Sequence, residues 1–379
     1  MMPRVPHLQW GAVRPRASRR ALPAVRMPDA CGNDAIVIAA LVAGGLLTGD
    51  PEVVAALDEP DLNALIEFGQ PAWRELGTRL GELAAAGAIP AAARLPAGQY
   101  DAVLPIRITD FTDFYASLEH ATNFGRIFRP GTPPVRGNWR HMPVGYNGRA
   151  STIVVSGTPV RRPYGQVALG ELAPTRALDL ECELGYVCGP TSPAAIAVDR
   201  AEEHIFGVVL VNDWSARDVQ RVEYEPLGPL NGKSFATSMS AWITPLDALA
   251  GARVAPRSQD PQPADYLRAR APWILDAALE IELSGEVISR PRAAELYWTP
   301  AQMLAQLTVN GARLSAGDLL ATGTISGAEP GTEGSLAELW RGERWLLDGD
   351  EVVLRGRAGG IELGEVRGRV APASRRNRR

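Results

Sequence analysis

Cysteine and histidine are scarce in this chain of 379 residues, and their scarcity excludes two kinds of structure. The 3 cysteines, Cys31, Cys182 and Cys188, are too few for a disulfide framework, and the count is typical of a reducing compartment. With only 4 histidines besides, no combination of ligands is typical of a zinc site. We therefore expect a cytoplasmic protein that folds without disulfides.

Long apolar runs and a strong excess of one charge are also missing. The longest apolar run, residues 35–47, is several residues too short to span a bilayer, so we expect no membrane partner. The net charge of −4 gives no reason to expect nucleic acid as a partner. An arginine-rich start precedes the apolar run, but Asp29 and Asp34 separate the two and no small-residue cleavage site follows, which is unlike a targeting peptide.

The length and composition predict a globular protein of two domains, with 46% hydrophobic and 22% charged residues. We place the boundary near residue 103. In the N-terminal domain, residues 1–103, the first 34 residues show no strand pattern, and residues 61–86 have the apolar spacing of a helix. The second domain, residues 104–379, has many short β-like runs and few helices, so the predicted fold class is mostly β (α+β).

Local patterns divide the chain further. We expect helices at residues 112–128, 214–222 and 299–308, the last with Thr299 as its cap and Pro300 in its first turn. The expected strands are residues 160–165, 178–187, 205–212, 277–283, 318–321, 344–347 and 351–355. Outside these, we expect a helix or a strand plus helix at 35–47, a linker at 87–98 and a solvated basic tail at 375–379.

Residues 204–237 bring four different polar groups into one short unit. An apolar run predicts a buried strand, and Asp213, Arg217 and Gln220 follow at spacings that place them on one face of a helix that Asp213 can cap. A loop rich in glycine and proline, residues 226–232, then leads to Lys233. An ordinary surface helix with an Asp–Arg pair explains the spacing equally well. The nearby GPLNGKS is one residue short of a phosphate-binding P-loop, so we do not expect a nucleotide site.

Further carboxylates stand in positions where they can join this unit. Glu181 and Glu183 lie two apart on a predicted strand and so share a face, which is either functional or solvent-exposed. Asp113 is expected in the first turn of the helix at 112–128, where the helix dipole favours a carboxylate. His120 lies two turns further on the same face, and a structural role for a lone histidine remains an alternative.

These carboxylates predict a particular class of metal if they converge. An all-oxygen set of Asp113, Glu181, Glu183 and Asp213 suits magnesium or calcium rather than zinc or copper. Four carboxylates exceed the charge of a divalent ion, and Lys233 and Arg217 would balance the excess. Spacing alone does not prove that the four side chains meet.

Several motifs together make the chain similar to the fumarylacetoacetase family, within the fumarylacetoacetate hydrolase superfamily. The resemblance covers about residues 59–371. NDWSARD with GPLNGKSFAT is specific to the superfamily, and PVGYNGRAS with DFTDFY…H points to the fumarylacetoacetases within it. Further matching segments are VVSGTPVRRPYGQ and LLATGTISGAEPG.

The resemblance implies a fold, an assembly and a reaction. The fold would be a small N-terminal β-barrel-like domain followed by a C-terminal β-roll, in a homodimer. The reaction would be hydrolysis of a carbon–carbon bond of 4-fumarylacetoacetate to fumarate and acetoacetate, the last step of tyrosine and phenylalanine breakdown, with calcium or magnesium. The absence of strand patterns in residues 1–34 departs from the family and leaves the N-terminal barrel in question.

The resemblance also implies a role for each site residue. The metal ligands would be Asp113, Glu181, Glu183 and Asp213, with a second, mainly structural magnesium position near Asp213, Lys233 and Thr237. The general base would be His120, with Glu338 as its partner, and the oxyanion donors Arg217, Gln220 and Lys233. The diketo-acid substrate would contact Tyr115, Arg129, Tyr146, Gln220, Tyr224 and Thr324.

Two other functions stay open from the residues alone. An acylpyruvate hydrolase or another diketo-acid enzyme of the same superfamily would share the carboxylates, although such chains are generally shorter. A non-catalytic metal-binding relative that acts as an interaction protein would lack the base, whereas His120 and Glu338 are both present.

Overall fold

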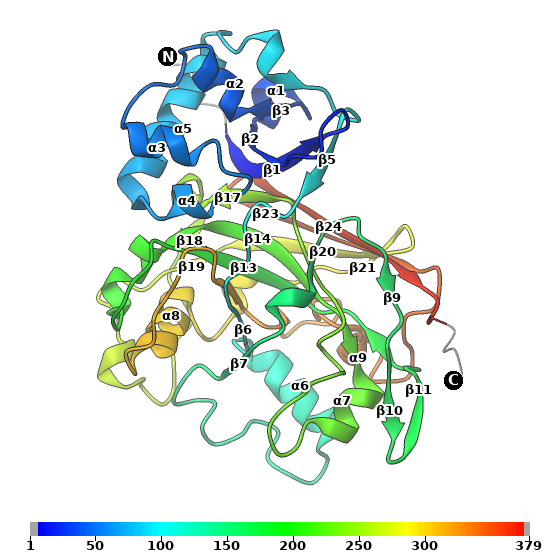
Figure 1. The fold of residues 1–379 in the computed structure, drawn as a ribbon. Coiled ribbons are helices and arrows are strands. Elements are labelled where there is room, and N and C mark those ends of the chain that lie inside the picture. The colour runs from blue at the N-terminus through cyan, green and yellow to red at the C-terminus, as the bar shows by residue number, and fades with distance from the viewer. Residues whose placement is uncertain (1–6, 375–379) are drawn as a thin grey trace.

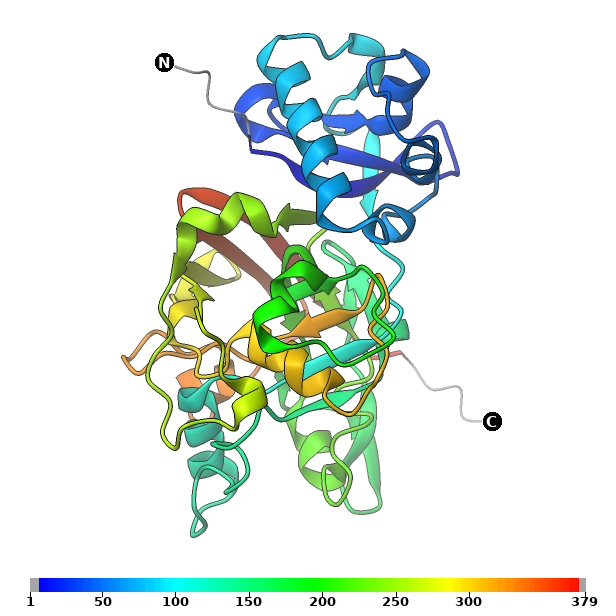
Figure 2. The same ribbon diagram turned by 90° about the vertical axis from the view of Figure 1, so that its left-hand side faces the viewer.

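The computed structural model describes residues 7–374, which form a smaller N-terminal lobe above a larger, strand-rich body (Figures 1 and 2). None of the helices in this described part is long and apolar enough to cross a lipid bilayer. The predicted basic tail, residues 375–379, lies outside the described residues, as do residues 1–6 of the predicted irregular start.

The N-terminal lobe contains strands that the sequence patterns did not indicate. Its strands are β1 (Gln9–Pro15), β2 (Leu22–Arg26), β3 (Ala35–Val37), β4 (Arg94–Leu95) and β5 (Tyr100–Val103). Its helices are α1 (Pro28–Cys31), α2 (Ile38–Ala43), α3 (Pro51–Ala56), α4 (Asn63–Ile66) and α5 (Gly69–Ala85). The prediction of an irregular start is therefore wrong for β1 and β2, and the predicted linker contains β4. The strand plus helix expected at residues 35–47 is confirmed by β3 and α2.

A 13-stranded sheet runs from this lobe into the larger body. Its main path is β4-β3-β2-β1-β17-β14-β13-β22-β6-β7, which is open at both ends, with β5, β16 and β8 paired beside it. Strand β1 pairs with β17, so the sheet passes from one lobe to the other. The strands of the body in this sheet are β6 (Phe111–Phe114), β7 (Gly145–Asn147), β8 (Ile153–Val155), β13 (Cys182–Cys188), β14 (Ile205–Asp213), β16 (Thr237–Met239), β17 (Trp242–Pro245) and β22 (Leu319–Ala321).

A second sheet of five strands packs against the first, in the order β21-β20-β23-β24-β9. Its strands are β9 (Val160–Arg161), β20 (Ala277–Leu283), β21 (Glu286–Ser289), β23 (Glu351–Ala358) and β24 (Ile361–Ala371). Short pairs complete the body: β10 (Tyr164–Ala168) with β11 (Glu171–Pro174), β12 (Leu178–Asp179) with β15 (Ser215–Ala216), and β18 (Arg253–Val254) with β19 (Ile274–Leu275). The expected strand at residues 344–347 does not form.

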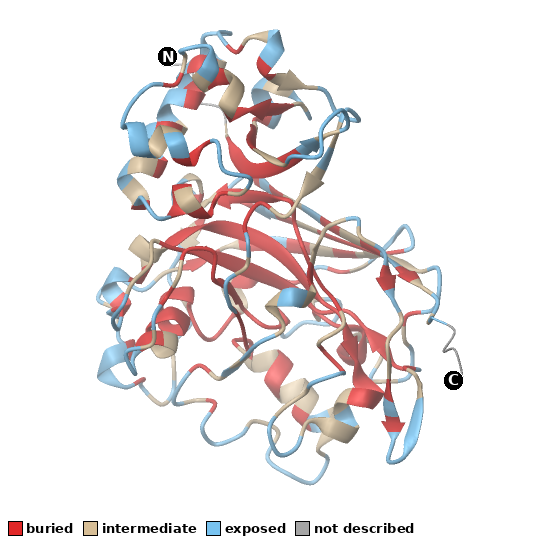
Figure 3. Ribbon diagram, viewed as in Figure 1, coloured by how far each residue is buried: buried red, intermediate tan, exposed pale blue. Residues whose placement is uncertain are grey.

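Strands β13 and β14 are buried along their whole length because both faces of this part of the sheet are covered (Figure 3). Val208 and Leu210 of β14 belong to the core that faces the second sheet, whereas Val209 and Val211 belong to the core beneath the N-terminal lobe. A strand covered on both faces reads as a continuous apolar run, as residues 205–211 do. The two strands thus form a rigid, water-free platform for the carboxylates at their ends.

Several helices lie on the side of the body away from the N-terminal lobe (Figure 1). They are α6 (Leu118–Phe128), α7 (Arg217–Glu223), α8 (Pro300–Thr308) and α9 (Leu336–Leu339), of which α8 lies to one side in the view. Residues 112–114 belong to β6 rather than to a helix, because they pair with β22 and β7. Ser117 caps α6 instead, so the predicted helical placement of Asp113 is wrong.

The predicted start of α8 is confirmed in detail. The Thr299 hydroxyl accepts a hydrogen bond from the Gln302 backbone N–H at 3.2 Å, and the Gln302 side chain accepts one from the Thr299 N–H at 3.1 Å. This reciprocal pair is a capping box, and Pro300 follows in the first turn, where it loses no helical hydrogen bond.

We expect Thr299→Ala to lower the free energy of unfolding by about 1 kcal/mol, since it removes a buried helix cap. The shift in the urea denaturation midpoint measures the effect. Thr299→Ser keeps the hydroxyl and serves as the control. Equal stability of the alanine variant and the parent would contradict the role of the cap.

Candidate active site

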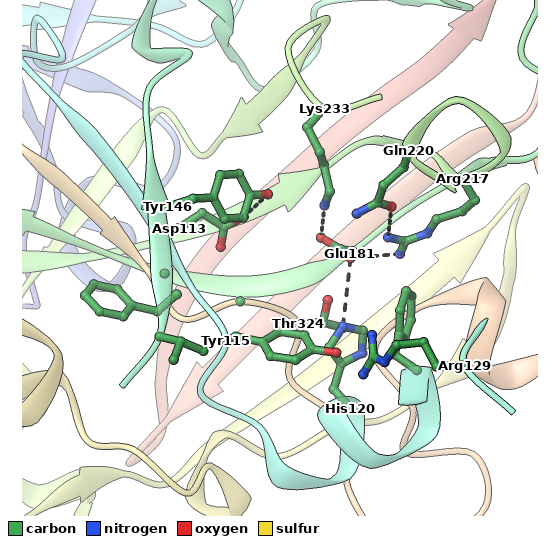
Figure 4. A pocket seen from close by; sticks show the side chains of 15 residues that line it. Asp113, Tyr115, His120, Arg129, Tyr146, Glu181, Arg217, Gln220, Lys233 and Thr324 are labelled. Atoms are coloured by element: carbon green, nitrogen blue, oxygen red, sulfur yellow. Dashed lines mark hydrogen bonds and ion pairs between the residues drawn. The ribbon is translucent and has the colours of Figure 1, made fainter. Parts of the chain in front are cut away.

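A cavity of about 290 Å³ opens where strand ends, α6 and α7 meet (Figure 4). Of the predicted site residues, it is lined by Asp113, Tyr115, His120, Arg129, Tyr146, Glu181, Arg217, Gln220, Lys233 and Thr324. Such a volume is at the lower end of the range of small-molecule sites. These residues come from segments up to 211 positions apart (324 − 113), and the fold brings them together.

The four predicted carboxylates converge beside this cavity, and two of them, Asp113 and Glu181, line it. One ligand atom from each of Asp113, Glu181, Glu183 and Asp213 lies within 4.8 Å of the others, and all four residues are buried. Asp113 stands on β6, Glu183 on β13 and Asp213 at the end of β14. The solvent-exposed alternative for Glu181 and Glu183 is therefore wrong, because both residues are buried and Glu181 pairs with Lys233 and Arg217.

Burial and mutual repulsion affect the four carboxylates unequally. Burial, followed by the charge of Asp213, raises the pKa of Asp113 to about 7. Burial and the neighbouring carboxylates raise the pKa of Glu183 well above its ordinary value. For Glu181 burial opposes ionisation, but Lys233, Arg217 and His120 outweigh it and lower the pKa. The pKa is thus raised for Asp113 and Glu183, which have the fewest cationic partners among the four carboxylates.

Lys233 and Arg217 neutralise the side of the cluster nearest to α7 (Figure 4). The Lys233 ammonium lies 2.5 Å from Asp213 Oδ2 and also contacts Glu181 Oε2. Arg217 places Nη2 2.8 Å from Glu181 Oε1. The loop that carries Lys233 approaches α7 closely at Gly232, where a Cβ would lie 2.8 Å from the Gln220 backbone nitrogen. A larger residue at this position would push the loop, and with it Lys233, away from the helix.

The predicted common helical face of Asp213, Arg217 and Gln220 is only partly correct. Asp213 ends β14, and Ala216 rather than Asp213 stands at the N-terminus of α7. Arg217 and Gln220 are on the helix, where the Arg217 Nη1 donates to the Gln220 side-chain oxygen at 3.1 Å. The alternative of a surface helix is wrong as well, because Arg217 is buried.

Several carboxylate oxygens in the cluster are free to bind a cation. Asp113 Oδ1 and both side-chain oxygens of Glu183 are buried and accept no hydrogen bond from the described residues. Unsatisfied buried oxygens are costly unless another group binds them. An all-oxygen set with free, aimed lone pairs fits a divalent hard cation, so the residues present could hold a metal here.

His120 lines the same cavity, beside Glu181, and is oriented by Glu338. Its Nδ1 is 2.7 Å from Glu338 Oε2, and its Nε2 is 3.9 Å from Glu181 Oε1. Burial acts to raise the pKa of Glu338, but the charge and hydrogen bond of His120 lower it, helped by Asn123 and Ser335. An ionised Glu338 accepts a hydrogen bond from Nδ1–H, and in this tautomer the lone pair of the imidazole is on Nε2.

The remaining predicted residues lie at the margins of the site. Tyr224 lines a smaller adjoining cavity with Arg129, Arg217 and Gln220 rather than the main one. Thr237 lies behind the cluster, where its hydroxyl donates to Asp213 Oδ1 at 2.9 Å. Tyr146 donates to Asp113 Oδ2 at 3.0 Å, so a residue expected to contact substrate also supports a carboxylate.

The sequence patterns missed several residues that orient the site. Asn123, Ser326 and Ser335 donate to Glu338 at 3.0, 2.9 and 2.8 Å. Asp179 accepts from Arg217 Nε at 2.8 Å and from the Leu336 backbone N–H at 2.8 Å, so it ties Arg217 to the helix that carries Glu338. Asn123 lies three residues after His120 on α6, and Ser335 lies three before Glu338, so helical spacing could have indicated these two. Ser326 and Asp179 join the site only in the folded chain.

Arg149 is a cationic residue of the site that the sequence patterns did not indicate. It is part of the segment PVGYNGRAS, to which the sequence analysis attached no cationic role. Its guanidinium contacts Asp113 Oδ2 at 2.6 Å and also Asp213 Oδ1, and its side chain is 4% exposed. The cluster therefore has a third cation beside Lys233 and Arg217.

Comparison with known proteins places this site in a family. The family described as fumarylacetoacetate (FAA) hydrolase, C-terminal, matches residues 109–371, which include all the site residues named above. The chain belongs to the fumarylacetoacetate hydrolase family, and it is a hydrolase.

Curated relatives place the chain more narrowly within that family. It is 41% identical to the fumarylacetoacetase of Bos taurus over 396 aligned positions, which cover 94% of each chain. It is 40% identical to that of Homo sapiens with the same coverage, and 35% identical to that of Dictyostelium discoideum, covering 98% and 96% of the two chains. The predicted resemblance to fumarylacetoacetases is thereby confirmed.

Solved structures share the fold at lower identity. A fumarylacetoacetate hydrolase from Exiguobacterium antarcticum superimposes with a TM-score of 0.61 at 18% identity, covering 96% of this chain and 99% of that one. A 5-carboxymethyl-2-hydroxymuconate delta-isomerase from Mycobacterium smegmatis gives 0.57 at 17% identity, covering 97% and 100%. The strand-rich mixed fold is therefore shared with these proteins.

We expect divalent metal to bind more tightly as pH rises from 6 to 8. Below its pKa of about 7 Asp113 carries a proton that a metal must displace, and Glu183, whose pKa is also raised, can add a second. Below these pKa values, each unit by which the pH is lowered should weaken metal binding about tenfold for each proton that the metal displaces. Titration of Mn²⁺ in buffers of different ionisation enthalpy measures both affinity and proton release. A dissociation constant independent of pH, without proton release, would contradict this assignment.

Proposed function

We propose that this protein hydrolyses the carbon–carbon bond of 4-fumarylacetoacetate to give fumarate and acetoacetate, using a divalent metal. One observation carries the proposal: His120, paired with Glu338, lines the same cavity as Asp113 and Glu181, two members of the buried four-carboxylate cluster. The identity to curated fumarylacetoacetases supports the choice of substrate. The substrate is a 1,3-diketone, in which one carbonyl can be attacked while the other stabilises the leaving carbon.

His120 is assigned as the general base that activates water. Its free Nε2 takes a proton from water, and the hydroxide adds to the carbonyl next to the alkene. Glu338, fixed on Nδ1, stabilises the imidazolium that results. When the carbon–carbon bond breaks, its electron pair remains on the acetoacetate half as an enolate. The imidazolium then returns the proton to that carbon, so that water is added across the broken bond.

The developing negative charges have partners at both ends of the cavity. We assign Lys233, Arg217 and Gln220 as donors to the oxyanion, and fixed donors of this kind are each worth on the order of 3 kcal/mol. A divalent ion held by Asp113, Glu181, Glu183 and Asp213 would polarise the diketone oxygens and stabilise the enolate. Its presence would also offset the mutual repulsion of the carboxylates, which raises the pKa of Asp113 and Glu183.

The carboxylates of the substrate need cations and hydroxyl groups away from the acidic cluster. Arg129 lines the cavity, and its buried Nε has no hydrogen-bond acceptor among the described residues. The Thr324 hydroxyl is likewise buried without such a partner. We assign these two groups, with Tyr115, Tyr146 and Tyr224, to substrate binding, because an unpaired buried donor becomes favourable once an anionic ligand accepts from it.

Finer features of the proposal rest on the resemblance to the family. They are calcium or magnesium as the ion, a second magnesium position near Asp213, Lys233 and Thr237, and assembly as a homodimer. They also include a barrel-like N-terminal domain up to residue 103, a C-terminal β-roll, a cytoplasmic location and a place at the end of tyrosine breakdown. The strands of residues 7–103 do not form a closed ring of hydrogen-bonded pairs in the large sheet. A barrel-like domain there would therefore be an incompletely closed one.

The substrate and the metal can be tested together. We expect fast loss of the ultraviolet absorbance of fumarylacetoacetate with Mg²⁺ or Ca²⁺, and its suppression by chelator. Loss with a simple acylpyruvate, but not with fumarylacetoacetate, would overturn the proposed substrate. Undiminished turnover after complete removal of metal would overturn the proposed metal.

We expect His120→Ala to abolish turnover while metal binding is retained, since His120 is assigned to water activation and not to the metal. The fall in kcat should be at least about 10²-fold, the lower range for loss of a general base. Turnover by the same assay and Mn²⁺ titration measure the two effects separately. Loss of metal binding in this variant would count against the assignment, and so would kcat close to that of the parent.

A further inference from the structure

Arg149 enters the site from an unusual backbone position. It precedes the short turn at Ala150–Thr152 with φ 59° and ψ 17°, in the left-handed region that few residues other than glycine adopt. Such a conformation persists where the surrounding contacts hold it in place. Here the side chain extends into the protein and is 4% exposed.

The guanidinium joins two carboxylates whose strands are not neighbours in the sheet. Nη2 lies 2.6 Å from Asp113 Oδ2 on β6, and Nη1 contacts Asp213 Oδ1 at the end of β14. Strands β13 and β22 stand between β14 and β6 in the sheet. No backbone ladder therefore couples the two carboxylates directly, and Arg149 spans the gap.

Further contacts fix the guanidinium at this position. The Tyr146 hydroxyl is 3.0 Å from Nη2, and the Thr237 hydroxyl is 3.1 Å from Nη1. The guanidinium carbon lies 4.8 Å from the centre of the Phe111 ring and 5.0 Å from that of Tyr146. A cation enclosed by aromatic rings and carboxylates is poorly screened by water, so its charge acts strongly on the cluster.

Arg149 leaves oxygens of the cluster available. It uses Oδ2 of Asp113, whereas Oδ1 of Asp113 and both Glu183 oxygens accept no hydrogen bond from the described residues. A divalent ion on those oxygens can therefore be bound while Arg149 stays in place. The ion would bind beside a fixed positive charge, which opposes its binding.

We propose that Arg149 is the resident counter-ion of the cluster: it stabilises the buried carboxylates when no metal is bound and, by its charge, weakens their affinity for metal. When all four carboxylates are ionised, as metal binding requires, Arg149, Lys233 and Arg217 leave the cluster with a net charge of about −1, and without Arg149 the net charge is about −2. The stronger negative charge attracts a divalent ion more. The inference rests on the metal site of the proposed function and gives that site a tuning residue.

Two substitutions separate the charge of Arg149 from its bridging geometry. Arg149→Lys keeps the charge but cannot donate to both carboxylates in the same way, whereas Arg149→Met removes the charge as well. Mn²⁺ affinity is measured by electron paramagnetic resonance of the free ion. Melting temperature is measured with chelator and with saturating Mn²⁺.

We expect Arg149→Met to bind Mn²⁺ about tenfold or more tightly than the parent, and Arg149→Lys to stay within about threefold of the parent. With chelator the methionine variant should melt several degrees lower than the parent, and Mn²⁺ should restore most of that loss. Arg253→Met is the matched control, because Arg253 also pairs with a carboxylate, Glu202, and stacks on an aromatic ring, Trp273. Its Mn²⁺ affinity should equal that of the parent, and Mn²⁺ should not restore its stability.

Equal or weaker Mn²⁺ binding by Arg149→Met would overturn the inference, because Arg149 would then only position the ligands. If that variant does not fold even with Mn²⁺, Arg149→Lys still decides, since a tenfold tighter affinity there would exclude charge as the cause. Failure of the parent itself to bind Mn²⁺ would instead count against the metal of the proposed function.

Discussion

Four carboxylates buried within 4.8 Å of one another are the constraint on which the rest of this site depends. Removing even one ionised carboxylate from water is expensive, and like charges at such distances add to the cost. The fold answers with three buried cations, Lys233, Arg217 and Arg149, each in contact with at least one of the four. This compensation is uneven, because the pKa of Glu181 is lowered by its cationic partners, whereas burial and neighbouring carboxylates raise the pKa of Asp113 and of Glu183. The two carboxylates with the least compensation also hold the oxygens that accept no hydrogen bond from the described residues.

The platform beneath the cluster explains how such a costly arrangement is held. Strands β13 and β14 are covered on one face by the second sheet and on the other by the N-terminal lobe, so their ends have little freedom to move apart. A role for the smaller lobe follows from this packing, since it completes the burial of the strands that carry Glu183 and Asp213. His120, the proposed base, is held on α6 by Glu338, which accepts hydrogen bonds from Asn123, Ser326 and Ser335. Asp179 links the helix that carries Glu338 to Arg217, and Arg217 pairs with Glu181, so the supports of His120 and of the carboxylates are connected.

Much of this arrangement could be predicted from sequence where the signal is local. The apolar run before Asp213 and the Thr299 cap depend on neighbouring residues, and the structure agrees with both. The strand expected at residues 178–187 is interrupted, because Glu181 lies between β12 and β13. Pairing between distant segments could not be predicted from the sequence. Residues 112–114 have a helical pattern but belong to β6, because they pair with β22 and β7. The strands at the N-terminus were missed for the same reason, since β1 is stabilised by pairing with β2, β5 and β17. Arg149 lies 36 residues from Asp113 and 64 from Asp213, and no spacing rule connects groups so far apart.

We propose that the carboxylate cluster is the metal site of a carbon–carbon hydrolase. Anomalous diffraction at a wavelength suited to manganese, from crystals of active protein grown with Mn²⁺, tests this directly. We expect an anomalous peak enclosed by Asp113, Glu181, Glu183 and Asp213, and its loss in crystals of Glu183→Gln. A map without a peak at the cluster, from protein whose turnover requires the metal, would contradict it.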